Sequence, residues 1–366
     1  NNHLMGTRKI CFIIPSLQAG GMERVMSELA WYFAEKSDVE LHLVLYGISR
    51  EIFYTIPDNI IIYRPSFNFR EERRFFSTIR TLVFLRKTVK QINPQSVLSF
   101  GEYWNNFVLL GVLGLRSSVY VSDRSQPDKS LGWFHDRLRL WLYPTSKGLI
   151  FQTEKAREIF LKKAKHPNTI VIGNPIRKTN TLEAHYTKEK YVLMVGRLIR
   201  TKHQDILIKI FARLNFPDWK LILVGYDHLK QQNMERLKSL ASDLGVSERV
   251  VFMGKLSNLE KLYHESSIFA FTSSSEGFPN AIGEAMAAGL PVVAFDCIAG
   301  PSEMITDGYD GFMVPLFNID LFQSRLAALM SNEPLRLRLG SNAKKSIEKF
   351  SQKKICEDFY RFVLQN

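Results

Sequence analysis

Cysteine is scarce in this 366-residue chain, and its three cysteines (Cys11, Cys297 and Cys356) lie far apart. No pair has the spacing of a metal-binding or redox motif. The eight histidines also lack metal-ligand spacing, and there is no Asp-x-Asp pair of the kind that binds Mg²⁺ or Mn²⁺. We therefore expect no disulfide framework and no metal site. An odd, low cysteine count is typical of a reducing cytoplasm.

Long apolar runs are absent as well. Stretches such as "VLLGVLGL" (108–115) are far shorter than the roughly 20 residues that a membrane-spanning helix needs. No G-x-G-x-x-G occurs, so the dinucleotide-binding fingerprint is missing. What remains is a globular composition, with 45% hydrophobic and 23% charged residues, and a length that favours two domains.

The charge is unevenly distributed. The net charge is +13, and residues 1–175 carry 24 Lys and Arg against 15 Asp and Glu. Within that half, residues 64–90 hold eight basic and two acidic residues interleaved with Phe, Leu, Ile and Val. A basic amphipathic helix of this kind is typical of contact with an anionic membrane surface. The alternative is a helix that packs on its own domain with its basic face in water.

Short apolar runs alternate with helical periodicity along the chain, which predicts parallel sheets covered by helices on both faces. Asn174-Pro175 and the polar run that follows mark a boundary. We expect two doubly wound, Rossmann-like α/β domains that face each other across a cleft. They would comprise residues 1–173 and 174–348, with a C-terminal helix in 349–366 that packs back on the first domain.

Two glycines, Gly20 and Gly21, separate the first predicted strand from a helix. Glycine lets the backbone approach a ligand closely, and a helix N-terminus favours an anion. The alternative is a turn that needs a positive φ angle.

Two cations, Arg197 and Lys202, follow the strand predicted at 191–195. In doubly wound sheets, ligands bind beyond the carboxyl ends of the strands. Arg can contact two phosphate oxygens at once and Lys supplies a point charge, so the pair predicts a diphosphate site. The alternative is two ordinary surface cations on a loop.

The stretch "SSSEGFPNAIGEAMAAG" (273–289) places Glu276 in a loop and Glu284 in a helix rich in small residues. We expect the backbone N–H groups of Gly277, Phe278, Asn280 and Ala281 to point outward at the helix start, beside a carboxylate acceptor. Such a set suits a sugar with ring hydroxyls and an attached phosphate. The residues around this helix start are Gly277, Phe278, Pro279 and Asn280. The alternative is that Glu284 is a surface residue of an amphipathic helix.

This pair of glutamates separated by seven residues resembles the signature of family-4 retaining glycosyltransferases, which have the GT-B fold. "GG-x-ER" at 20–24, "VGRL" at 195–198 followed by Lys202, and "VFMG" at 251–254 are similar to that family in order and spacing. The resemblance covers essentially the whole chain and is most specific in its second half.

The resemblance implies roles for these residues. Glu284 would bind the donor ribose, and Glu276 would bind hydroxyls of the transferred sugar. Arg197 and Lys202 would hold the nucleotide diphosphate and stabilise its charge as it leaves. The other donor contacts would come from Gly20, Gly21, Gly277, Phe278, Pro279, Asn280, Gly254 and Lys255. The family generally needs no metal, so we expect a UDP-sugar as co-substrate and no cofactor. Retention without an obvious nucleophile implies a front-side displacement.

One loop of the first domain departs from the family. Many relatives carry a histidine after the strand that corresponds to "SSVYVSD", whereas Arg124 stands here. Arginine cannot act as a base, but it can bind an anion such as the diphosphate of a lipid-linked acceptor. Asp123 and Glu102 are the other acceptor-side candidates, with ordinary loop polarity as the alternative for each.

We therefore expect a hexose or N-acetylhexosamine to be moved from a UDP-sugar to a glycan carried on a polyprenyl diphosphate, in surface polysaccharide or glycan assembly. The enzyme would be peripheral on the cytoplasmic face of the cell membrane. A sugar-nucleotide epimerase of the same architecture is the alternative. Nucleic acid is not an expected partner, because the cations do not form a stripe with stacking aromatics.

Overall fold

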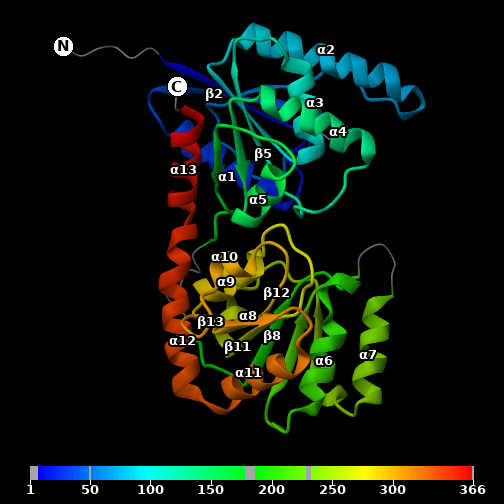
Figure 1. The fold of residues 1–366 in the computed structure, drawn as a ribbon, viewed down its shortest axis with the longest axis vertical. Coiled ribbons are helices and arrows are strands. Elements are labelled where there is room, and N and C mark those ends of the chain that lie inside the picture. The colour runs from blue at the N-terminus through cyan, green and yellow to red at the C-terminus, as the bar shows by residue number, and fades with distance from the viewer. Residues whose placement is uncertain (1–6, 49–50, 178–185, 228–231, 365–366) are drawn as a thin grey trace, which may run out of the picture. The chain divides into compact units, whose positions relative to one another are not determined.

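The computed structural model describes residues 7–48, 51–177, 186–227 and 232–364. They form two compact units (Figure 1). Unit 1 consists of the chain up to Pro175 together with the segment from Gln352 onward, and unit 2 is Ile176–Ser351. Each unit is a parallel sheet flanked by helices, so the two Rossmann-like α/β domains that the sequence predicts are present.

The sheet of unit 1 has the strand order β3-β2-β1-β4-β5-β6-β7, and all neighbouring strands are parallel. Its strands are β1 (Arg8–Ile14), β2 (Val39–Leu45), β3 (Ile61–Tyr63), β4 (Ser96–Phe100), β5 (Ser118–Ser122), β6 (Gly148–Phe151) and β7 (Thr169–Val171). Its helices are α1 (Gly21–Ala34), α2 (Arg74–Ile92), α3 (Glu102–Val112), α4 (Trp133–Leu142), α5 (Glu154–Leu161) and α13 (Gln352–Leu364).

The sheet of unit 2 has the order β10-β9-β8-β11-β12-β13, again parallel throughout. Its strands are β8 (Tyr191–Val195), β9 (Lys220–Val224), β10 (Val250–Gly254), β11 (Ile268–Phe271), β12 (Val292–Asp296) and β13 (Gly311–Pro315). Its helices are α6 (Gln204–Arg213), α7 (Asn233–Asp243), α8 (Glu260–Glu265), α9 (Asn280–Ala287), α10 (Pro301–Met304), α11 (Ile319–Ser331) and α12 (Glu333–Ser346).

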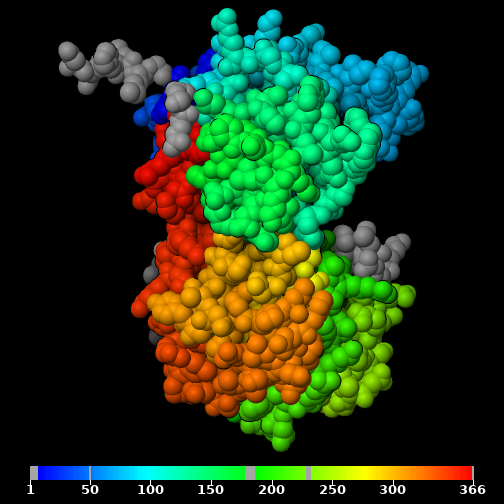
Figure 2. Space-filling model, in the orientation of Figure 1, coloured from blue at the N-terminus to red at the C-terminus, as the bar shows by residue number. Residues whose placement is uncertain are grey.

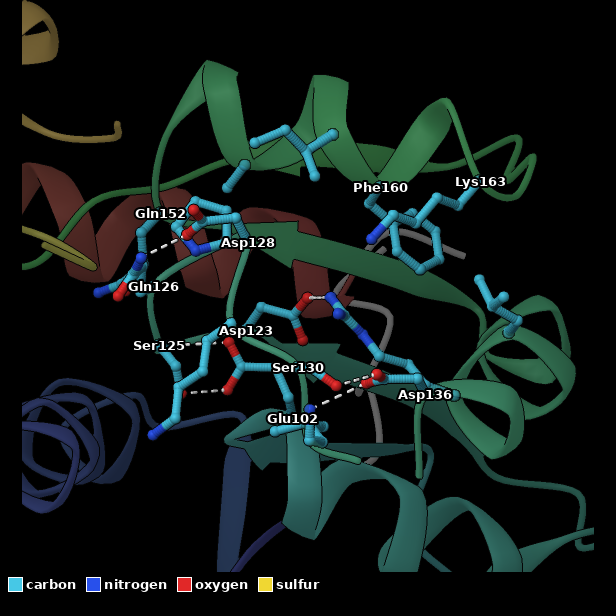
Figure 3. A pocket seen from close by; sticks show the side chains of 17 residues that line it. Glu102, Asp123, Ser125, Gln126, Asp128, Ser130, Asp136, Gln152, Phe160 and Lys163 are labelled. Atoms are coloured by element: carbon cyan, nitrogen blue, oxygen red, sulfur yellow. Dashed lines mark hydrogen bonds and ion pairs between the residues drawn. The ribbon is translucent and has the colours of Figure 1, made fainter. Parts of the chain in front are cut away.

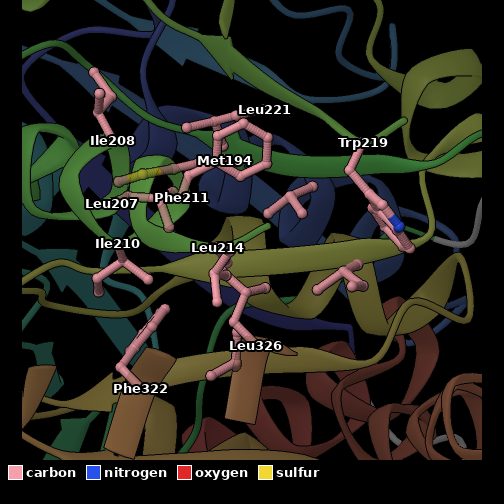
Figure 4. Packing of buried hydrophobic residues seen from close by; sticks show 14 of the residues in the cluster. Met194, Leu207, Ile208, Ile210, Phe211, Leu214, Trp219, Leu221, Phe322 and Leu326 are labelled. Atoms are coloured by element: carbon pink, nitrogen blue, oxygen red, sulfur yellow. The ribbon is translucent and has the colours of Figure 1, made fainter. Parts of the chain in front are cut away.

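Burial on both faces explains why the strands read as unbroken apolar runs. Residues 10–14 of β1 are fully buried, as parallel strands covered by helices must be. In unit 2, Phe211 of α6 and Phe322 of α11 belong to one apolar cluster with Trp219 (Figure 4). The cores therefore hold the carboxyl ends of the strands, and the loops after them, in fixed positions.

One strand escaped the sequence analysis. The three residues of β3 (Ile61–Tyr63) form an edge strand that pairs with β2 through residues 42–44. A three-residue run between Pro57 and Pro65 is shorter than the usual length of a strand, so periodicity alone does not reveal it.

The chain passes between the units at Pro175/Ile176 and at Ser351/Gln352. The expected boundaries were residues 173/174 and 348/349. The backbone N–H of Ile176 donates to the carbonyl of Phe350 (2.8 Å), and the Phe350 ring packs edge-on against Phe278 (5.4 Å between centroids). These contacts hold residues 349–351 in unit 2. The sequence analysis had instead assigned these residues to the segment of the C-terminal helix.

Helix α13 belongs to unit 1, although it follows the whole of unit 2 in sequence. The carbonyl of Val363 accepts a hydrogen bond from Ser96 Oγ (2.8 Å), and the Phe362 ring packs against Tyr120 (5.4 Å between centroids). A Cβ on Gly148 would lie 2.7 Å from the Phe362 ring, so glycine is needed there for the helix to dock. In Figure 1 the helix lies beside α1, which it contacts.

Candidate active site

A close approach of two backbones shapes the carboxyl end of β8. A Cβ on Gly225 would lie 1.9 Å from the carbonyl oxygen of Gly196, and Gly225 has a φ of 158°. The N–H of Gly196 donates to the carbonyl of Val224 (2.9 Å). Only glycine fits at residue 225, and the contact fixes the loop that starts at Gly196 and carries the two predicted cations.

The structure places Arg197 and Lys202 on this loop, as the sequence predicts. The Arg197 side chain is exposed. The backbone carbonyl of Arg197 accepts a hydrogen bond from Gln204 Nε2 (2.9 Å). Lys202 ends a short 3₁₀ helix (Arg200–Lys202), and its Nζ lies 5.7 Å from the centroid of the Phe271 ring. The charge of Lys202 is thus held against the end of β11.

Lys202 Nζ and Glu276 Oε1 form an ion pair that is largely withdrawn from water, with 14% and 13% of the two side chains exposed. The loop that carries Glu276 is tied to the Lys202 loop by its backbone, because the Ser274 N–H donates to the carbonyl of Thr201 (2.9 Å). Thr272 Oγ1 donates to the carbonyl of Lys202 (2.9 Å). Two of the three predicted catalytic residues therefore meet.

The start of α9 differs in detail from the expectation. Phe278 is a core residue, only 7% exposed. Pro279 has φ −83° and ψ 74°, an inverse γ-turn, so the Asn280 N–H donates to the carbonyl of Phe278 (3.0 Å). The prediction that the Asn280 N–H points outward is wrong, since the turn already uses it. The predicted donor contacts of Gly277, Phe278 and Asn280 stay predictions.

Glu284 lies on α9 and is half-buried. Its Oε2 accepts a hydrogen bond from the hydroxyl of Tyr263 (3.0 Å), which comes from α8. Burial and the neighbouring Glu284 carboxylate raise the pKa of Tyr263 well above its usual value, so this hydroxyl stays a donor. The arrangement fixes the direction of one carboxylate oxygen, which a ribose-binding glutamate requires.

The ends of β9 and β10 lie side by side. Gly254 has a φ of 66°, and its carbonyl accepts a hydrogen bond from the Gly225 N–H (2.9 Å). The exposed Lys255 reaches over the ring of Tyr226, with 5.4 Å between Nζ and the ring centroid. The exposed ring of Tyr226 therefore lies at the same edge of the sheet as Gly254 and Lys255, the two predicted donor-binding residues.

In unit 1, Gly20 and Gly21 lie at the carboxyl end of β1, as predicted. Neither has a positive φ angle, which excludes the turn that was the alternative reading. The Gly20 N–H donates to the hydroxyl of Tyr54 (3.1 Å), and that hydroxyl donates to the Gly20 carbonyl (2.9 Å). The Gly20 amide is therefore engaged, whereas a Cβ on Gly21 would have nothing within 4 Å.

Two of the acceptor-side candidates, Glu102 and Asp123, line a cavity of about 110 Å³ at the ends of β4 and β5 (Figure 3). Glu102 Oε1 accepts the N–H of Arg124 (3.0 Å) and that of Ser125 (2.7 Å), and Oε2 accepts the Ser125 hydroxyl (2.7 Å). Glu102 thus holds the loop that follows β5 in place.

Asp123 is the more unusual carboxylate because it is buried and has two close donors. Arg139 of α4 forms an ion pair with its Oδ2, and the hydroxyl of Tyr143 donates to its Oδ1. Burial raises the pKa of Asp123 to about 6, Arg139 opposes this shift, and nearby Glu102 adds to it. A carboxyl group that titrates close to neutrality beside a cavity is typical of functional sites.

Arg124 does not line this cavity. Its Nη1 donates to Asn174 Oδ1 (2.8 Å), and its guanidinium lies over the rings of Phe100 (4.1 Å) and Phe359 (5.2 Å). Burial lowers its pKa to about 9, against the opposing charges of Glu102 and Asp123. The Arg124 side chain thus lies outside the cavity that Glu102 and Asp123 line, although its backbone N–H is bound to Glu102. Its proposed contact with an acceptor diphosphate stays a prediction.

Among the described residues, no three His, Cys, Asp or Glu side chains gather as a metal site requires. No described helix is long and apolar enough to cross a membrane.

Comparison with known proteins identifies one domain of the chain. The family model for glycosyl transferases group 1 matches residues 177–346, which carry the Lys202–Glu276 pair and Glu284. These residues form a domain of this group. The epimerase alternative finds no support in these comparisons.

Two relatives match along almost the whole chain. An N-acetylgalactosaminyltransferase of Campylobacter jejuni, named for an acceptor on diphospho-undecaprenol, is 27% identical, with 98% of this chain and 100% of the relative covered. The amylovoran biosynthesis glycosyltransferase AmsD of Erwinia amylovora is 26% identical, with 90% and 92% covered.

Solved structures share its fold. The Anabaena HepE protein in complex with UDP has a TM-score of 0.82 at 19% identity, with 96% of this chain and 98% of the other covered. The lipopolysaccharide outer core galactosyltransferase WaaB has a TM-score of 0.80 at 20% identity, with 97% and 99% covered. These GT-B structures agree with the fold class that the sequence predicts.

Sequence analysis missed several side chains that shape these sites. Tyr226 could have been found, because an aromatic residue directly after a strand in a doubly wound sheet lies on the ligand-binding edge. Tyr263, Arg139 and Tyr54 carry no such signal. Each contacts a site residue that is distant in sequence, so only the folded chain reveals it.

Proposed function

We propose that this glycosyltransferase moves a hexose or N-acetylhexosamine from a UDP-sugar, with retention and without a metal ion, to a glycan carried on a polyprenyl diphosphate. The observation that carries the proposal is the ion pair of Lys202 and Glu276 at the carboxyl end of β8, with the exposed Arg197 on the same loop. The UDP complex of HepE and the diphospho-undecaprenol acceptor in the name of the Campylobacter relative support it.

In this mechanism the cations act on the leaving group. Arg197 and Lys202 stabilise the negative charge that develops on the diphosphate, and fixed charges of this kind need no rearrangement as the bond breaks. Glu276 accepts hydrogen bonds from hydroxyls of the transferred sugar, and its ion pair with Lys202 fixes its position. Glu284, oriented by Tyr263, accepts hydroxyls of the donor ribose.

Retention follows if the acceptor attacks from the side that the diphosphate leaves. The departing diphosphate then takes the proton of the acceptor hydroxyl while the new glycosidic bond forms. The chain itself supplies charge stabilisation and orientation in this step, and no residue becomes covalently attached to the sugar. Because the cations of the loop take the role that a divalent metal plays in other transferases, we expect activity to survive chelation by EDTA.

The acceptor and the place of action are part of the same proposal. On α2, Phe75 and Phe76 are 72% and 67% exposed, and on α4, Trp133 is 74% exposed. Figure 2 shows α2 (light blue to cyan) and the segment of α3 and α4 (teal) as adjoining parts of the surface of unit 1, and α3 contacts both helices. Exposed aromatics among arginines suit the anionic inner face of a cell membrane, where a polyprenyl-linked acceptor would be found.

The decisive experiment incubates the purified chain with UDP-sugars and a short-chain polyprenyl diphosphate that carries one N-acetylhexosamine. We expect UDP release coupled to a new glycosidic bond, with the anomeric configuration of the donor preserved in the NMR spectrum of the product. Lys202→Ala is the matched inactive variant.

Other outcomes would contradict the proposal in distinct ways. An isomerised donor without a new bond would indicate the epimerase, and an inverted linkage would remove the retaining mechanism. Salt-sensitive binding to DNA with no UDP binding would favour a nucleic-acid partner, which we do not expect.

A further inference from the structure

A second and larger cavity of unit 1 lies beside the acceptor-side carboxylates. It has a volume of about 490 Å³, within the range of small-molecule sites, and lies at the carboxyl end of β2 between α2 and α3. The first turn of α3 separates the two cavities, because Glu102 lines the smaller one while Tyr103 and Trp104 line the larger.

Aromatic rings from two elements form one wall. Tyr46 follows β2 and stacks on Phe107 (5.4 Å between centroids, 18° between planes), and it meets Trp104 edge-on (6.1 Å). Tyr103 in turn packs edge-on against Trp104 (5.0 Å). Trp104 and Phe107 are only half-buried, so parts of both rings stay open to the cavity.

The backbone around Tyr46 is fixed by a close contact. The N–H of Gly47 donates to the carbonyl of Pro15 (2.7 Å), and a Cβ on Gly47 would lie 2.6 Å from that oxygen. The contact between Gly47 and Pro15, which follow β2 and β1, therefore fixes the backbone of the cavity-lining residues Tyr46 and Gly47.

The rest of the lining is mixed. Phe69, Glu71, Arg74 and Thr78, from the beginning of α2 and the segment before it, line the cavity together with Ile48. The hydroxyl of Tyr46, on the aromatic side, is buried and has no hydrogen-bond partner. An unpaired buried hydroxyl is unfavourable, and a ligand or water entering from the cavity would satisfy it.

This combination decides between two ligand chemistries. An alkyl chain would offer no hydrogen bond to the buried Tyr46 hydroxyl or to Glu71 and Arg74. A sugar ring presents an apolar face to an aromatic ring and hydroxyls to charged groups on the other side. The cavity also lies at the strand edge where doubly wound sheets bind ligands.

We propose that this cavity, with Trp104 and Tyr103 as its platform and Glu71 and Arg74 as hydrogen-bonding groups, binds a sugar ring of the acceptor glycan. The inference rests on the proposed function, because it needs a glycan acceptor. It adds a subsite in unit 1 that would select acceptors by their sugar and not by their lipid.

The test is saturation-transfer NMR with the methyl α-glycosides of glucose, galactose, N-acetylglucosamine and N-acetylgalactosamine as probes. We expect at least one of them to receive saturation from the wild-type protein. Trp104→Leu should reduce that transfer about fivefold or more, because stacking on the ring is lost. Trp141→Leu, which changes an exposed tryptophan outside the cavity, should leave the transfer unchanged.

A second variant separates binding from folding. Tyr46→Phe removes a hydroxyl that has no partner in the protein, so its thermal midpoint should be equal to or higher than that of the wild type. If the sugar satisfies this hydroxyl, its affinity should nevertheless fall about two- to tenfold.

The inference is overturned if none of the four glycosides receives saturation, or if Trp104→Leu leaves the transfer intact. Displacement of the sugar by farnesyl diphosphate, with loss of farnesyl diphosphate binding in Trp104→Leu, would assign the cavity to an isoprenoid instead. The thermal shift caused by UDP is measured on the same samples. A normal UDP shift with a negative sugar result refutes the subsite alone, whereas a missing UDP shift refutes the proposed donor.

Discussion

Lys202 and Glu276 form an ion pair between two loops that follow neighbouring strands of unit 2, β8 and β11. The close approach of Gly225 to Gly196 fixes the first loop, and the hydrogen bond from the Ser274 N–H to the Thr201 carbonyl ties the second loop to the first. A cation and a carboxylate are therefore held in place before any ligand binds. Such preorganisation is what makes fixed charges effective in catalysis.

Removal of the ammonium should slow the chemical step. We expect Lys202→Ala, and likewise Arg197→Ala, to lower kcat by about 10²–10³-fold, the usual effect of losing one group that stabilises developing charge. Turnover at saturating UDP-sugar measures this. Lys220→Ala, an exposed lysine at the start of β9, is the control and should behave as the wild type. A loss below about threefold for both active-site variants would contradict the role of these cations.

The ion pair also predicts non-additivity. Glu276→Gln alone leaves Lys202 with a neutral partner, so the double variant Lys202→Ala/Glu276→Gln should lose less activity than the product of the two single losses. A double-mutant cycle on kcat/KM measures the coupling, which we expect to be about 1–3 kcal/mol. Strict additivity would show that the pair does not act as a unit.

Tyr263 should act on the donor through Glu284. Tyr263→Phe removes the hydroxyl that orients Glu284 Oε2 and should raise the KM for the UDP-sugar about two- to tenfold, with little change in kcat. Tyr309→Phe, which alters a half-exposed tyrosine of the same unit, is the control. If Tyr263→Phe lowers kcat and leaves KM unchanged, Glu284 acts on the reaction and not on the ribose.

Gly225 should be intolerant of any side chain. Gly225→Ala places a Cβ 1.9 Å from the Gly196 carbonyl oxygen, and we expect a loss of about 3 kcal/mol or more in the free energy of unfolding. Gly245→Ala is the matched control, because Gly245 has a φ of 67° but open space around it. It should lose only about 1–2 kcal/mol from backbone strain. Urea unfolding of both variants compares the two, and equal losses would exclude a role for the close contact.

Asp123 should make stability depend on pH. Its pKa of about 6 in the folded state lies above the unfolded value, so its contribution to stability is present below about pH 4 and is lost as pH rises through 6. The thermal midpoint of the wild type relative to Asp123→Asn should therefore fall between pH 4.5 and pH 7. A relative midpoint that rises over this range would show that the ion pair with Arg139 outweighs burial.

Membrane binding should depend on the exposed aromatics of α2. We expect the wild-type protein to partition onto vesicles that contain phosphatidylglycerol and to be released by salt. Phe75→Ser combined with Phe76→Ser should reduce partitioning, whereas Leu337→Ser, which removes an exposed apolar residue of unit 2, should not. No binding at low salt would refute the peripheral location that we propose.

Local patterns in the chain were sufficient to predict most of the fold. The strand expected at 191–195 is present as β8, because parallel strands are buried on both faces and therefore form apolar runs. The helix that carries Glu284 and the pair of glutamates were also predictable, since their spacing along the chain is local. The short edge strand β3 and the last residues before α13 were not, because pairing and packing with distant residues decide them.

The sequence by itself determined two doubly wound units, the strand ends that carry Arg197, Lys202 and Glu276, and the likeness to glycosyltransferases. Only the tertiary structure decided which of these groups meet. It joined Lys202 to Glu276 and Tyr263 to Glu284, and it directed the Arg124 side chain to Asn174, outside the lining of the cavity of Glu102 and Asp123. The physical reason is that strand and helix propensities act between near neighbours, whereas ion pairs, buried hydroxyls and cavities arise where distant segments pack together.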